Sequence, residues 1–459
     1  MNRNTKRRAL PRLVVVLLAL GGLVLSTTAS PARAQKAHDR VTLTLWTNLS
    51  DPLSRSLLEP YFRQFEKSEP GVTIKFVSVP VTNNYVKYTT AIAAGRGPDV
   101  ILTPNFKPIP GWAANSLIQP LDPWYKQMNV SSTQWFPWVW QMQSFHGRIW
   151  TFAQEYDTAL FVWNKDAFKK AGLDPNRPPR TIAEMDTYAK KLTKFDSKGH
   201  LVQAGIVPWS NEGSDPRFWT TMFGGSLYDS VHHKYTINDP ANVRAFDWMG
   251  TYAKMLGGAD KANGFLKGFT GNADPLYTGQ VAMEVVGDWI PLFTFKPYAP
   301  HLNYGVARIP VASGVPYGTN IVLGSDMFVL PSGAHYPKQA AQLMLYMMRS
   351  APVLAWCVGE ANVPPTQAAA FSSSFVHGVP YMSGAVETAR GALKNPALLR
   401  PYPTSTIYDY VSGQLTTAMQ QVQFGKMSGQ AALSQVQQLA DQYLTKVKRD
   451  NPDWYSAGD

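Results

Sequence analysis

The sequence predicts an α/β protein whose chain is divided between two domains. Its 459 residues exceed what one hydrophobic core of ordinary size accommodates. Residues 41–103 read as strand, helix, strand, helix and strand, an order typical of a parallel sheet covered by helices. A second succession of strands and helices starts after residue 155. These observations favour two sheets of mainly parallel strands, each flanked by helices.

The first block begins with Val41–Trp46, where apolar and polar residues alternate as in a half-buried strand. Asp51 is a suitable N-cap for a following helix, and Pro52 suits its first turn. Pro60 lies inside the apolar repeat of this helix, so we expect the helix to be kinked or shortened there. The block should continue with a strand over 71–80, a helix over 85–97 and a strand over 98–104.

The second block opens with residues 158–168, which predict a strand that runs into a turn. Thr181 and Glu184 have the spacing of a capping box, which marks the start of a helix. Residues 204–209 indicate a further strand. The elements expected after it are helices over 241–256 and 273–279, strands over 281–289 and 322–331, a helix from Pro337 and a C-terminal helix over 431–448.

The first 34 residues have the three parts of a secretory signal peptide. A basic start is followed by an apolar run over 13–25 and by Ala32-Arg33-Ala34, so cleavage is expected before Gln35. Arg7 and Arg8 leave a twin-arginine export route open beside the general one. No cysteine follows the apolar run, and no later run is long enough to span a membrane. We therefore expect a soluble mature chain without a lipid anchor, either periplasmic or secreted.

Composition and motifs exclude several classes of protein. The 43 Lys and Arg against 31 Asp and Glu give a net charge of +12, and removal of the six basic residues in 1–34 leaves +6, too mild for a nucleic-acid binder. The single cysteine, Cys357, cannot form an internal disulfide, and its apolar neighbours indicate a buried thiol. No phosphate-binding loop, nucleophile elbow or paired Cys/His spacing occurs, so neither a cofactor nor a metal is expected.

Several stretches occur in the same order as in one known family and span nearly the whole mature chain. They are LTLWT at 43–47, AAGRGPDV at 93–100, WNKDAFKKAGLDPNRPPRTIAEM from 163, YTGQVAMEVVGDW at 277–289, LGSDMFVLPSGAHYPKQAAQLMLYM at 323–347 and NVPPTQAA at 362–369. Through them the chain resembles the family-1 extracellular solute-binding proteins of ATP-driven sugar importers, which include maltose-binding protein. The aromatic-Asn-Lys-Asp block and the Gly-x-Trp strand end are the most specific parts.

The resemblance implies a two-lobed periplasmic-binding-protein fold of type II, with a ligand cleft between two α/β lobes. It also implies a monomeric binding protein rather than an enzyme. Such a protein captures a carbohydrate, here a di- or oligosaccharide, as the lobes close, and delivers it to the transmembrane permease subunits of an ABC importer. The implied segments are 38–154 and 320–352 for the first lobe, 158–316 and 356–459 for the second, and crossings near 155–157, 317–319 and 353–355.

A sugar presents an apolar C–H face and a belt of hydroxyls, which an indole and carboxylates or amides complement. The resemblance places a stacking aromatic at Trp289 and a hydroxyl-binding carboxylate at Asp157. Each has a structural alternative, since Trp289 could fill the core and Asp157 could cap or pair near a crossing. The other expected ligand contacts are Trp46, Thr47, Asn48, Asn105, Glu155, Trp209, Asn211, Asp288, Ser325, Asp326 and Tyr408.

Two departures from the maltose-binding pattern indicate a ligand other than a maltodextrin. The tryptophan after the third strand of that pattern is Thr103 here, and its Asp-Arg pair is Phe106-Lys107. A glycerol-phosphate diester, an amino-acid-like solute or an anionic sugar is the alternative ligand, although 14 Trp and 21 Tyr favour a carbohydrate. A glycoside hydrolase is a further alternative, because Glu155 and Asp157 would share one face of a strand.

Overall fold

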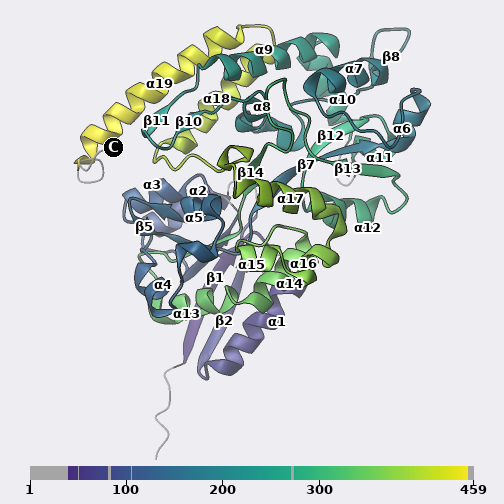
Figure 1. Ribbon diagram of the computed structural model, residues 1–459. Coiled ribbons are helices and arrows are strands. Elements are labelled where there is room, and N and C mark those ends of the chain that lie inside the picture. Colours follow the sequence, from purple (N-terminus) through teal and green to yellow (C-terminus); the bar gives the residue numbers. More distant parts are fainter. Residues whose placement is uncertain (1–39, 50, 81–83, 105, 270–272, 453–459) are drawn as a thin grey trace, which may run out of the picture. The chain divides into compact units, whose positions relative to one another are not determined.

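The computed structural model describes residues 40–49, 51–80, 84–104, 106–269 and 273–452 (Figure 1). The signal peptide expected over 1–34 and the expected ligand contact Asn105 lie outside these residues. Two five-stranded sheets organise the described chain, and three short two-stranded sheets accompany them.

The first sheet has the strand order β2-β1-β3-β15-β6. Strand β1 runs parallel to both of its neighbours, with Leu45 opposite Phe76 on one side and Val100 on the other. The parallel sheet predicted for the start of the mature chain is therefore confirmed. The strands are β1 (Val41–Thr47), β2 (Val72–Ser78), β3 (Val100–Thr103), β15 (Met327–Val329) and β6 (Thr151–Ala153), and the crossover helices are α1 (Pro52–Ser68) and α2 (Asn84–Ala93).

Helix α1 begins as its sequence predicts, because the side chain of Asp51 accepts hydrogen bonds from the backbone N–H groups of Leu53 and Ser54, both at 3.0 Å. The predicted shortening at Pro60 is wrong, since the helix is 17 residues long and extends past Pro60 to Ser68. Pro60 has no N–H to donate to the carbonyl of Ser56, one turn earlier. Both residues are exposed, so water can bond to that carbonyl instead. Helix α1 packs against α13 (Pro337–Met347) and α14 (Ser350–Glu360), beside β1 and β2 (Figure 1).

The second sheet is built around β7 (Asp157–Asn164), in which every residue is buried. Strand β7 pairs antiparallel with β12 (Met283–Gly287), β13 (Tyr304–Ala307) and β14 (Asn320–Gly324), whereas β14 pairs parallel with β16 (Leu399–Arg400). The expected predominance of parallel pairs therefore holds for β1–β3 but not around β7. The chain enters this sheet from β6 of the first sheet through residues 154–156 alone.

The predicted capping box is present at helix α7 (Ile182–Leu192), where Thr181 Oγ1 accepts from the N–H of Glu184. The strand predicted over 204–209 is wrong, because only Ala204 forms a bridge, to Val281. Pairing stops after Gly205 since Pro208 has no N–H to donate and the N–H of Ser210 turns back to the carbonyl of Val207. Trp209 therefore lies in a turn, and Asn211 begins a short 3-10 helix (Asn211–Ser214), so neither is at a strand end.

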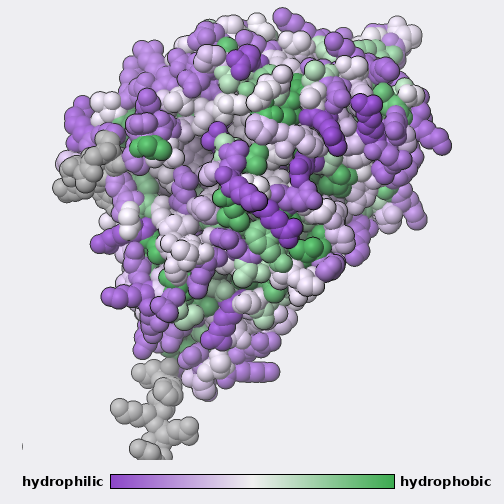
Figure 2. All heavy atoms as spheres, viewed as in Figure 1, coloured by the Kyte–Doolittle hydropathy of each residue, from purple (hydrophilic) through white to green (hydrophobic). Residues whose placement is uncertain are grey.

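The remaining helices surround these sheets, and α8, α9, α18 and α19 pack together (Figure 1). No helix of the described chain is both long and apolar enough to cross a membrane. On the face shown in Figure 2, polar residues are widespread and apolar ones form smaller patches between them. The helices are α3 (Ile109–Ala114), α4 (Asp122–Gln127), α5 (Pro137–Gln143), α6 (Lys165–Lys170), α8 (Pro216–Met222), α9 (Pro240–Met255), α10 (Ala259–Lys267), α11 (Pro275–Thr278), α12 (Lys296–Tyr298), α15 (Gln367–Ala370), α16 (Ser373–Gly378), α17 (Ser383–Ala392), α18 (Tyr408–Gln423) and α19 (Gly429–Asp450). The three hairpins pair β4 (Ser144–Phe145) with β5 (Arg148–Ile149), β8 (Lys194–Phe195) with β9 (Leu201–Gln203), and β10 (Tyr228–Asp229) with β11 (Lys234–Tyr235).

The chain passes between the two large sheets at residues 154–156, between β6 and β7, and again at Ser325-Asp326, between β14 and β15. Residues 353–355, near which a crossing is expected, lie inside α14, which packs on α1. The lobe boundaries expected from the sequence stay a prediction.

Candidate functional site

The strand end Gly287-Asp288-Trp289 has a specific steric requirement. Gly287 pairs with Ala159 at the end of β12, and the half-buried indole of Trp289 folds back over it. A Cβ atom added to Gly287 would lie 2.2 Å from the Cη2 and Cζ3 atoms of this ring, far inside normal contact. Glycine at this position therefore permits the position of the indole, as expected where a side chain approaches a strand closely.

Asp288 points into the interior behind this strand end and is fully buried. Its Oδ2 accepts a hydrogen bond from the N–H of Thr158 at 3.1 Å, and its own N–H donates to the carbonyl of Thr158 at 3.0 Å. The hydroxyl of Tyr381 donates to the carbonyl of Asp288 at 3.1 Å. Oδ1 of Asp288 is buried and has no hydrogen-bond partner among the residues that the structure describes, and burial raises the pKa of the carboxyl well above its ordinary value.

Four carboxyl groups that the sequence analysis selected come together at the two passages between the sheets, and we call them the acid cluster: Glu155, Asp157, Asp288 and Asp326. Glu155 Oε1 accepts from the N–H of Asp326, and Ser325 Oγ donates to the carbonyl of Glu155 at 2.5 Å. Asp157 Oδ1 accepts from the side-chain amide of Asn362. Glu155 and Asp288 are fully buried, whereas Asp157 keeps 8 % and Asp326 6 % of its surface exposed.

Burial and mutual repulsion give the acid cluster an unusual affinity for protons. Burial is the largest cause in each case, and it raises the pKa of Asp157 to about 6 and those of Glu155, Asp288 and Asp326 well above their ordinary range. The charge of Asp157 raises the pKa values of the other three further. Each of these carboxyls therefore binds a proton more readily than an ordinary carboxyl does, and a protonated carboxyl both donates and accepts hydrogen bonds. No cluster of side chains suited to a metal ion occurs within the described chain.

The turn after β14 brings the end of the first sheet against the acid cluster. A Cβ atom added to Gly324 would lie 2.9 Å from Asp157 Oδ2 and 3.3 Å from the carbonyl oxygen of Pro104, which follows β3. Gly324 thus allows Asp157 and the end of β3 to approach each other, which a larger residue would prevent.

A second group of charged residues, around the start of α8, adjoins the acid cluster. Asp215 caps α8 and forms an ion pair with Arg217, whose Nη2 lies 2.6 Å from Asp215 Oδ2. Arg217 also donates to the carbonyl of Val322 at 3.0 Å, and its guanidinium lies 3.5 Å from the ring centroid of Tyr402. Burial would raise the pKa of Asp215, but the charge of Arg217 holds it below the ordinary value. Burial and then the charges of Asp157 and Asp215 raise the pKa of Glu212 to about 7.

Sequence reasoning missed this second group. The Asp-Pro pair at 215–216 does carry a helix-start signal, since aspartate is a good N-cap and proline suits the first turn. That signal gives no indication that Arg217 returns to pair with the cap. Nothing in the sequence marks Glu212, because its position depends on contacts between distant segments. Asn362 begins the stretch NVPPTQAA, but that stretch gives no indication of its contact with Asp157.

A polar cleft of about 560 Å³ lies next to Trp209, and we call it the Trp209 cleft. Its wall contains Lys107 from the segment after β3 together with residues from the loop before α8 and from α18. The indole N–H of Trp209 donates to Asn263 Oδ1 at 2.8 Å, and the exposed Asn211 donates to Glu284 Oε2 at 3.1 Å. Of the residues expected to contact ligand, Trp209 is the one that lines this cleft.

The other expected contacts lie in two further places. Trp46 is half-buried, with Lys87 Nζ 5.5 Å from its ring centroid, and Thr47 is buried with Oγ1 accepting from the N–H of Leu49 at 3.0 Å. Asn48 follows directly, half-buried, after β1. Tyr408 begins α18 and is 1 % exposed, with its ring centroid 5.8 Å from that of Tyr402. This places Tyr408 in the interior rather than on an open surface.

The chain matches one protein-family model and is similar to several curated proteins. A family model described as "Bacterial extracellular solute-binding protein" matches residues 51–352. The chain is 26 % identical over 226 residues to the sn-glycerol-3-phosphate-binding periplasmic protein UgpB of Pectobacterium atrosepticum, which covers 46 % of this chain and 47 % of that protein. It is 28 % identical over 335 residues to UgpB of Salmonella typhimurium, covering 68 % and 72 %. The chain thus spans about half the length of the first of these relatives.

Solved structures resemble the chain over most of its length. The structure of CpMnBP1 with mannotriose bound has a TM-score of 0.77 and 28 % sequence identity, and the match covers 87 % of this chain and all of that one. The maltose/maltodextrin-binding domain from Bdellovibrio bacteriovorus bound to maltotriose has a TM-score of 0.68 at 18 % identity, covering 88 % of this chain and all of that one. The second likeness bears on the fold alone.

Proposed function

Because this chain belongs to the family of bacterial extracellular solute-binding proteins, we propose that it captures a carbohydrate, a di- or oligosaccharide, and delivers it unchanged to an ABC importer. The observation that carries the proposal is the combination of acceptor-rich carboxyls and indoles near the two passages between the sheets. Asp157 and Trp209 keep 8 % and 9 % of their surfaces exposed, and Trp289 is half-buried. Indoles suit the C–H face of a sugar and carboxyls suit its hydroxyls.

The proposed contacts follow from exposure. Asp157, Trp209, Asn211 and Trp289 would touch the ligand, as would Trp46, Asn48 and Asp326 where the lobes close on it. Thr47 is fully buried, and its Oγ1, which accepts from the N–H of Leu49, would instead shape the turn that carries Asn48. Glu155, Asp288 and Ser325 lie fully buried behind them and would hold Asp157 and Asp326 in place. The likeness to CpMnBP1 with mannotriose bound supports a carbohydrate ligand.

The charge of the region favours a neutral ligand. Carboxyl groups outnumber cations around the acid cluster and the start of α8, where they include Asp157, Glu212 and Asp215. Arg217 is already paired with Asp215. An anion would be repelled by any of these carboxylates that is ionised. A glycerol-phosphate ester remains the second candidate because the curated relatives bind sn-glycerol 3-phosphate, and Lys107 in the wall of the Trp209 cleft is the residue that favours it.

In this proposal the protein works by closure of two lobes and performs no chemistry. The lobes would consist of 38–154 with the first-sheet part of 320–352, and of 158–316 with 356–459. A ligand that binds both lobes only in the closed form shifts the population toward that form. We further propose that the protein is a monomer and that it leaves the cytoplasm by means of a cleaved signal over 1–34. It would then work in the periplasm or outside the cell, and membership of an extracellular family supports this location.

The test is a thermal-unfolding panel of mannobiose, mannotriose, maltose, maltotriose and sn-glycerol 3-phosphate. A ligand at 100 times its Kd stabilises the folded state by about 2.7 kcal/mol, so a binder raises the Tm clearly. We expect a shift with at least one saccharide, a large loss of that shift in Trp289→Ala, and little loss in Trp124→Ala, where a tryptophan of similar exposure on α4 is removed. A shift with sn-glycerol 3-phosphate alone would replace the carbohydrate by the anion, and hydrolysis of any saccharide would contradict capture without chemistry.

A further inference from the structure

A buried hydroxyl at the start of α1 lies between two carboxyl groups from distant parts of the chain. Ser54 Oγ is 2.5 Å from Oδ2 of Asp51, the N-cap of α1, and 2.9 Å from Oε1 of Glu360, the last residue of α14. The two helices approach closely here, since a Cβ atom added to Gly359 would lie 2.4 Å from Leu57 Cδ2. Ser54 and Glu360 are both buried, so water has little access to the contact between them. We call Asp51, Ser54 and Glu360 the Ser54 relay.

The two contacts of Ser54 need one proton more than the hydroxyl itself supplies. A hydroxyl donates a single hydrogen bond, and an ionised carboxylate only accepts. If Asp51 and Glu360 were both ionised, the hydroxyl could bond to one of them, and its oxygen would face the other with no proton in between. Both O···O distances lie within the range of an O–H···O hydrogen bond. One of the two carboxyls is therefore protonated in this arrangement.

The hydrogen bonds of Asp51 make it the ionised partner. Its Oδ1 accepts from the backbone N–H groups of Leu53 and Ser54, both at 3.0 Å. These groups form the positive end of the α1 dipole, where a negative charge is stabilised. Asp51 is also half-buried, so water reaches it, whereas Glu360 is buried. The extra proton therefore belongs to Glu360.

The charges around Glu360 lead to the same assignment. Three carboxyls face it, namely Asp51, Asp157 at the start of β7 and Asp326 before β15, and no cation of the described chain forms an ion pair with it. Burial is the main cause that raises the pKa of Glu360 to about 7, and the charges of Asp51 and Asp157 add to it, while the hydrogen bond from the hydroxyl opposes it. The other charged residues of α1 and α16, two helices that pack against α14, are exposed or pair with each other: Arg55, Glu59, Arg63, Glu66, Lys67 and His377.

We infer that Glu360 carries a proton in the folded protein and donates it to Ser54 Oγ, which donates in turn to Asp51, so that the relay ties the end of α14 to the start of α1. Each hydrogen bond of the relay then has its own proton. When Glu360 loses its proton, the hydroxyl serves only one of two facing carboxylates, and the connection between the helices is lost. The relay is thus a proton-dependent contact between two segments that are distant in sequence.

The relay also makes Glu360 a positioning residue for the ligand site, and this step rests on the proposed carbohydrate capture. Glu360 is followed by Ala361, which is buried in the left-handed conformation (φ 65°), and by Asn362, whose amide donates to Asp157 Oδ1. At the other end of the relay, Asp51 follows soon after β1, at whose end other expected ligand contacts lie. Release of the relay would therefore loosen Asn362 and, through it, the orientation of Asp157.

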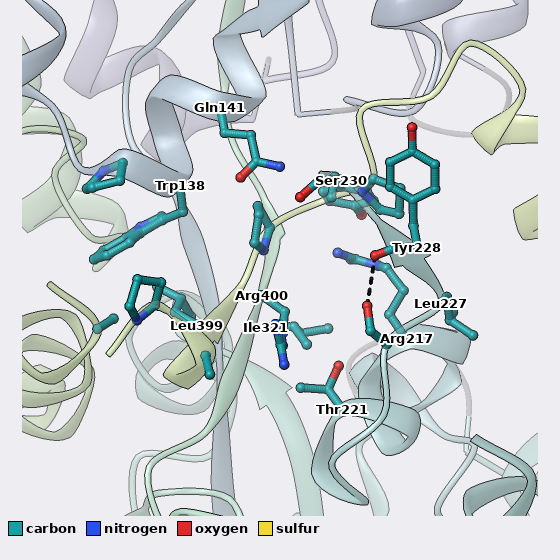
Figure 3. A pocket seen from close by; sticks show the side chains of 18 of the residues that line it. Trp138, Gln141, Arg217, Thr221, Leu227, Tyr228, Ser230, Ile321, Leu399 and Arg400 are labelled. Atoms are coloured by element: carbon teal, nitrogen blue, oxygen red, sulfur yellow. Dashed lines mark hydrogen bonds between the residues drawn. The ribbon is translucent and has the colours of Figure 1, made fainter. Parts of the chain in front are cut away.

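The Ser54 relay does not itself contact the regions open to a ligand. None of its side chains lines the Trp209 cleft or the cavity drawn in Figure 3, whose labelled side chains include Arg217 and Arg400. An effect of the relay on affinity therefore passes through the backbone after Glu360 and the hydrogen bond from Asn362 to Asp157.

The first test detects the proton in the absence of ligand, from the Tm of the purified protein at about pH 6 and about pH 8. A proton held more tightly in the folded than in the unfolded protein stabilises fully below the ordinary glutamate pKa of about 4.3, and this stabilisation is lost as the pH rises through about 7. Glu360→Gln supplies an amide that donates to Ser54 at every pH, so its Tm should fall less over this range than that of wild type. Glu387→Gln, at an exposed glutamate of α17 paired with Arg308, should keep the wild-type fall.

An equal fall of the Tm in Glu360→Gln and in wild type would overturn the inference. If Glu360→Gln does not fold, Ser54→Ala decides, because it removes the central hydroxyl. It should lower the Tm more at about pH 6, where wild type has both bonds of the relay, than at about pH 8, where Glu360 has lost its proton. Ser56→Ala is the matched control, at an exposed serine of the same helix that bonds within its own turn, and should show no such difference. An equal loss at both pH values in Ser54→Ala would also contradict the proton on Glu360.

The second test measures the positioning role with a saccharide that the thermal panel identifies. The wild-type Kd should rise between about pH 6 and about pH 8, and at the higher pH Glu360→Gln should bind at least about fivefold more tightly than wild type, which is the lower end of the usual coupling between two sites. Glu387→Gln should match wild type. Identical pH profiles in Glu360→Gln and wild type would overturn the positioning role. If no saccharide binds at all, carbohydrate capture is contradicted instead, and the ligand-free melting still decides where the proton lies.

Discussion

Replacing Gly287 by alanine tests whether the strand end is built to hold the indole of Trp289. The added Cβ would lie 2.2 Å from two ring carbons, whereas carbon atoms in contact are normally about 3.5–4.0 Å apart. The ring or the strand must therefore move by more than about 1 Å, and overpacking of this kind costs about 1–3 kcal/mol. Reduced freedom of the unfolded chain offsets about 0.4–1 kcal/mol of that cost. We expect a net loss of about 1–2 kcal/mol together with weaker carbohydrate binding.

Urea unfolding and titration with the strongest saccharide of the panel measure the two effects. Gly264→Ala is the control, because Gly264 lies in α10 with no atom within 4 Å of an added Cβ, and alanine there should be neutral or mildly stabilising. Gly287→Ala in a Trp289→Ala background isolates the clash, since the cost should nearly disappear once the ring is absent. An unchanged cost in that background would show that the ring is not its cause. Full stability and affinity in the single variant would refute the reasoning altogether.

Three further predictions follow from the buried charges. Burial raises the pKa of Asp157 to about 6 and that of Glu212 to about 7, so the folded protein binds more protons than the unfolded chain between about pH 4 and pH 7. The stabilisation from this proton binding is complete below about pH 4 and is lost as the pH rises through about 7. The free energy of unfolding should therefore fall over this range, and Asp157→Asn should make the fall smaller. Arg217→Met removes the ion-pair partner of Asp215, whose side chain is only 16 % exposed, and should cost about 1–3 kcal/mol in urea unfolding, part of which Asp215→Asn in the same chain restores. Burial raises the pKa of the Cys357 thiol well above its ordinary value. Iodoacetamide should therefore label Cys357 in guanidinium chloride but not in the native protein. Rapid labelling of the native protein would contradict the burial of this thiol.

Local sequence signals predicted most of the elements. The alternation in Val41–Trp46, the N-cap Asp51 and the capping box at Thr181 all depend on neighbours in sequence, and each has the structure expected from it. The failures occur where tertiary context decides. Pro60 is tolerated inside α1 because it faces solvent, and residues 204–209 lose their strand partner after one bridge. Neither outcome could be predicted without the position of the surrounding chain.

The candidate site was predictable only where a residue lies at a strand end or matches a family motif. Asp157 and Asp288 meet because β7 and β12 pair. Their apolar sequences indicate two buried strands, but not that these two strands are partners. The contact of Asn362 with Asp157 joins residues that are 205 positions apart, and no local pattern indicates it.

The ion pair of Asp215 and Arg217 connects the Trp209 cleft to the second sheet. Asp215 lines the cleft, and Arg217 donates a hydrogen bond to the carbonyl of Val322 in β14. Arg217 is buried and the side chain of Asp215 is only 16 % exposed, so each charge depends largely on the other for compensation. The charge of Arg217 keeps Asp215 ionised, and the charge of Asp215 in turn raises the pKa of Glu212. A change at Arg217 is therefore transmitted through Asp215 to Glu212, beside the acid cluster, although Arg217 itself contacts no expected ligand residue among those that the structure describes.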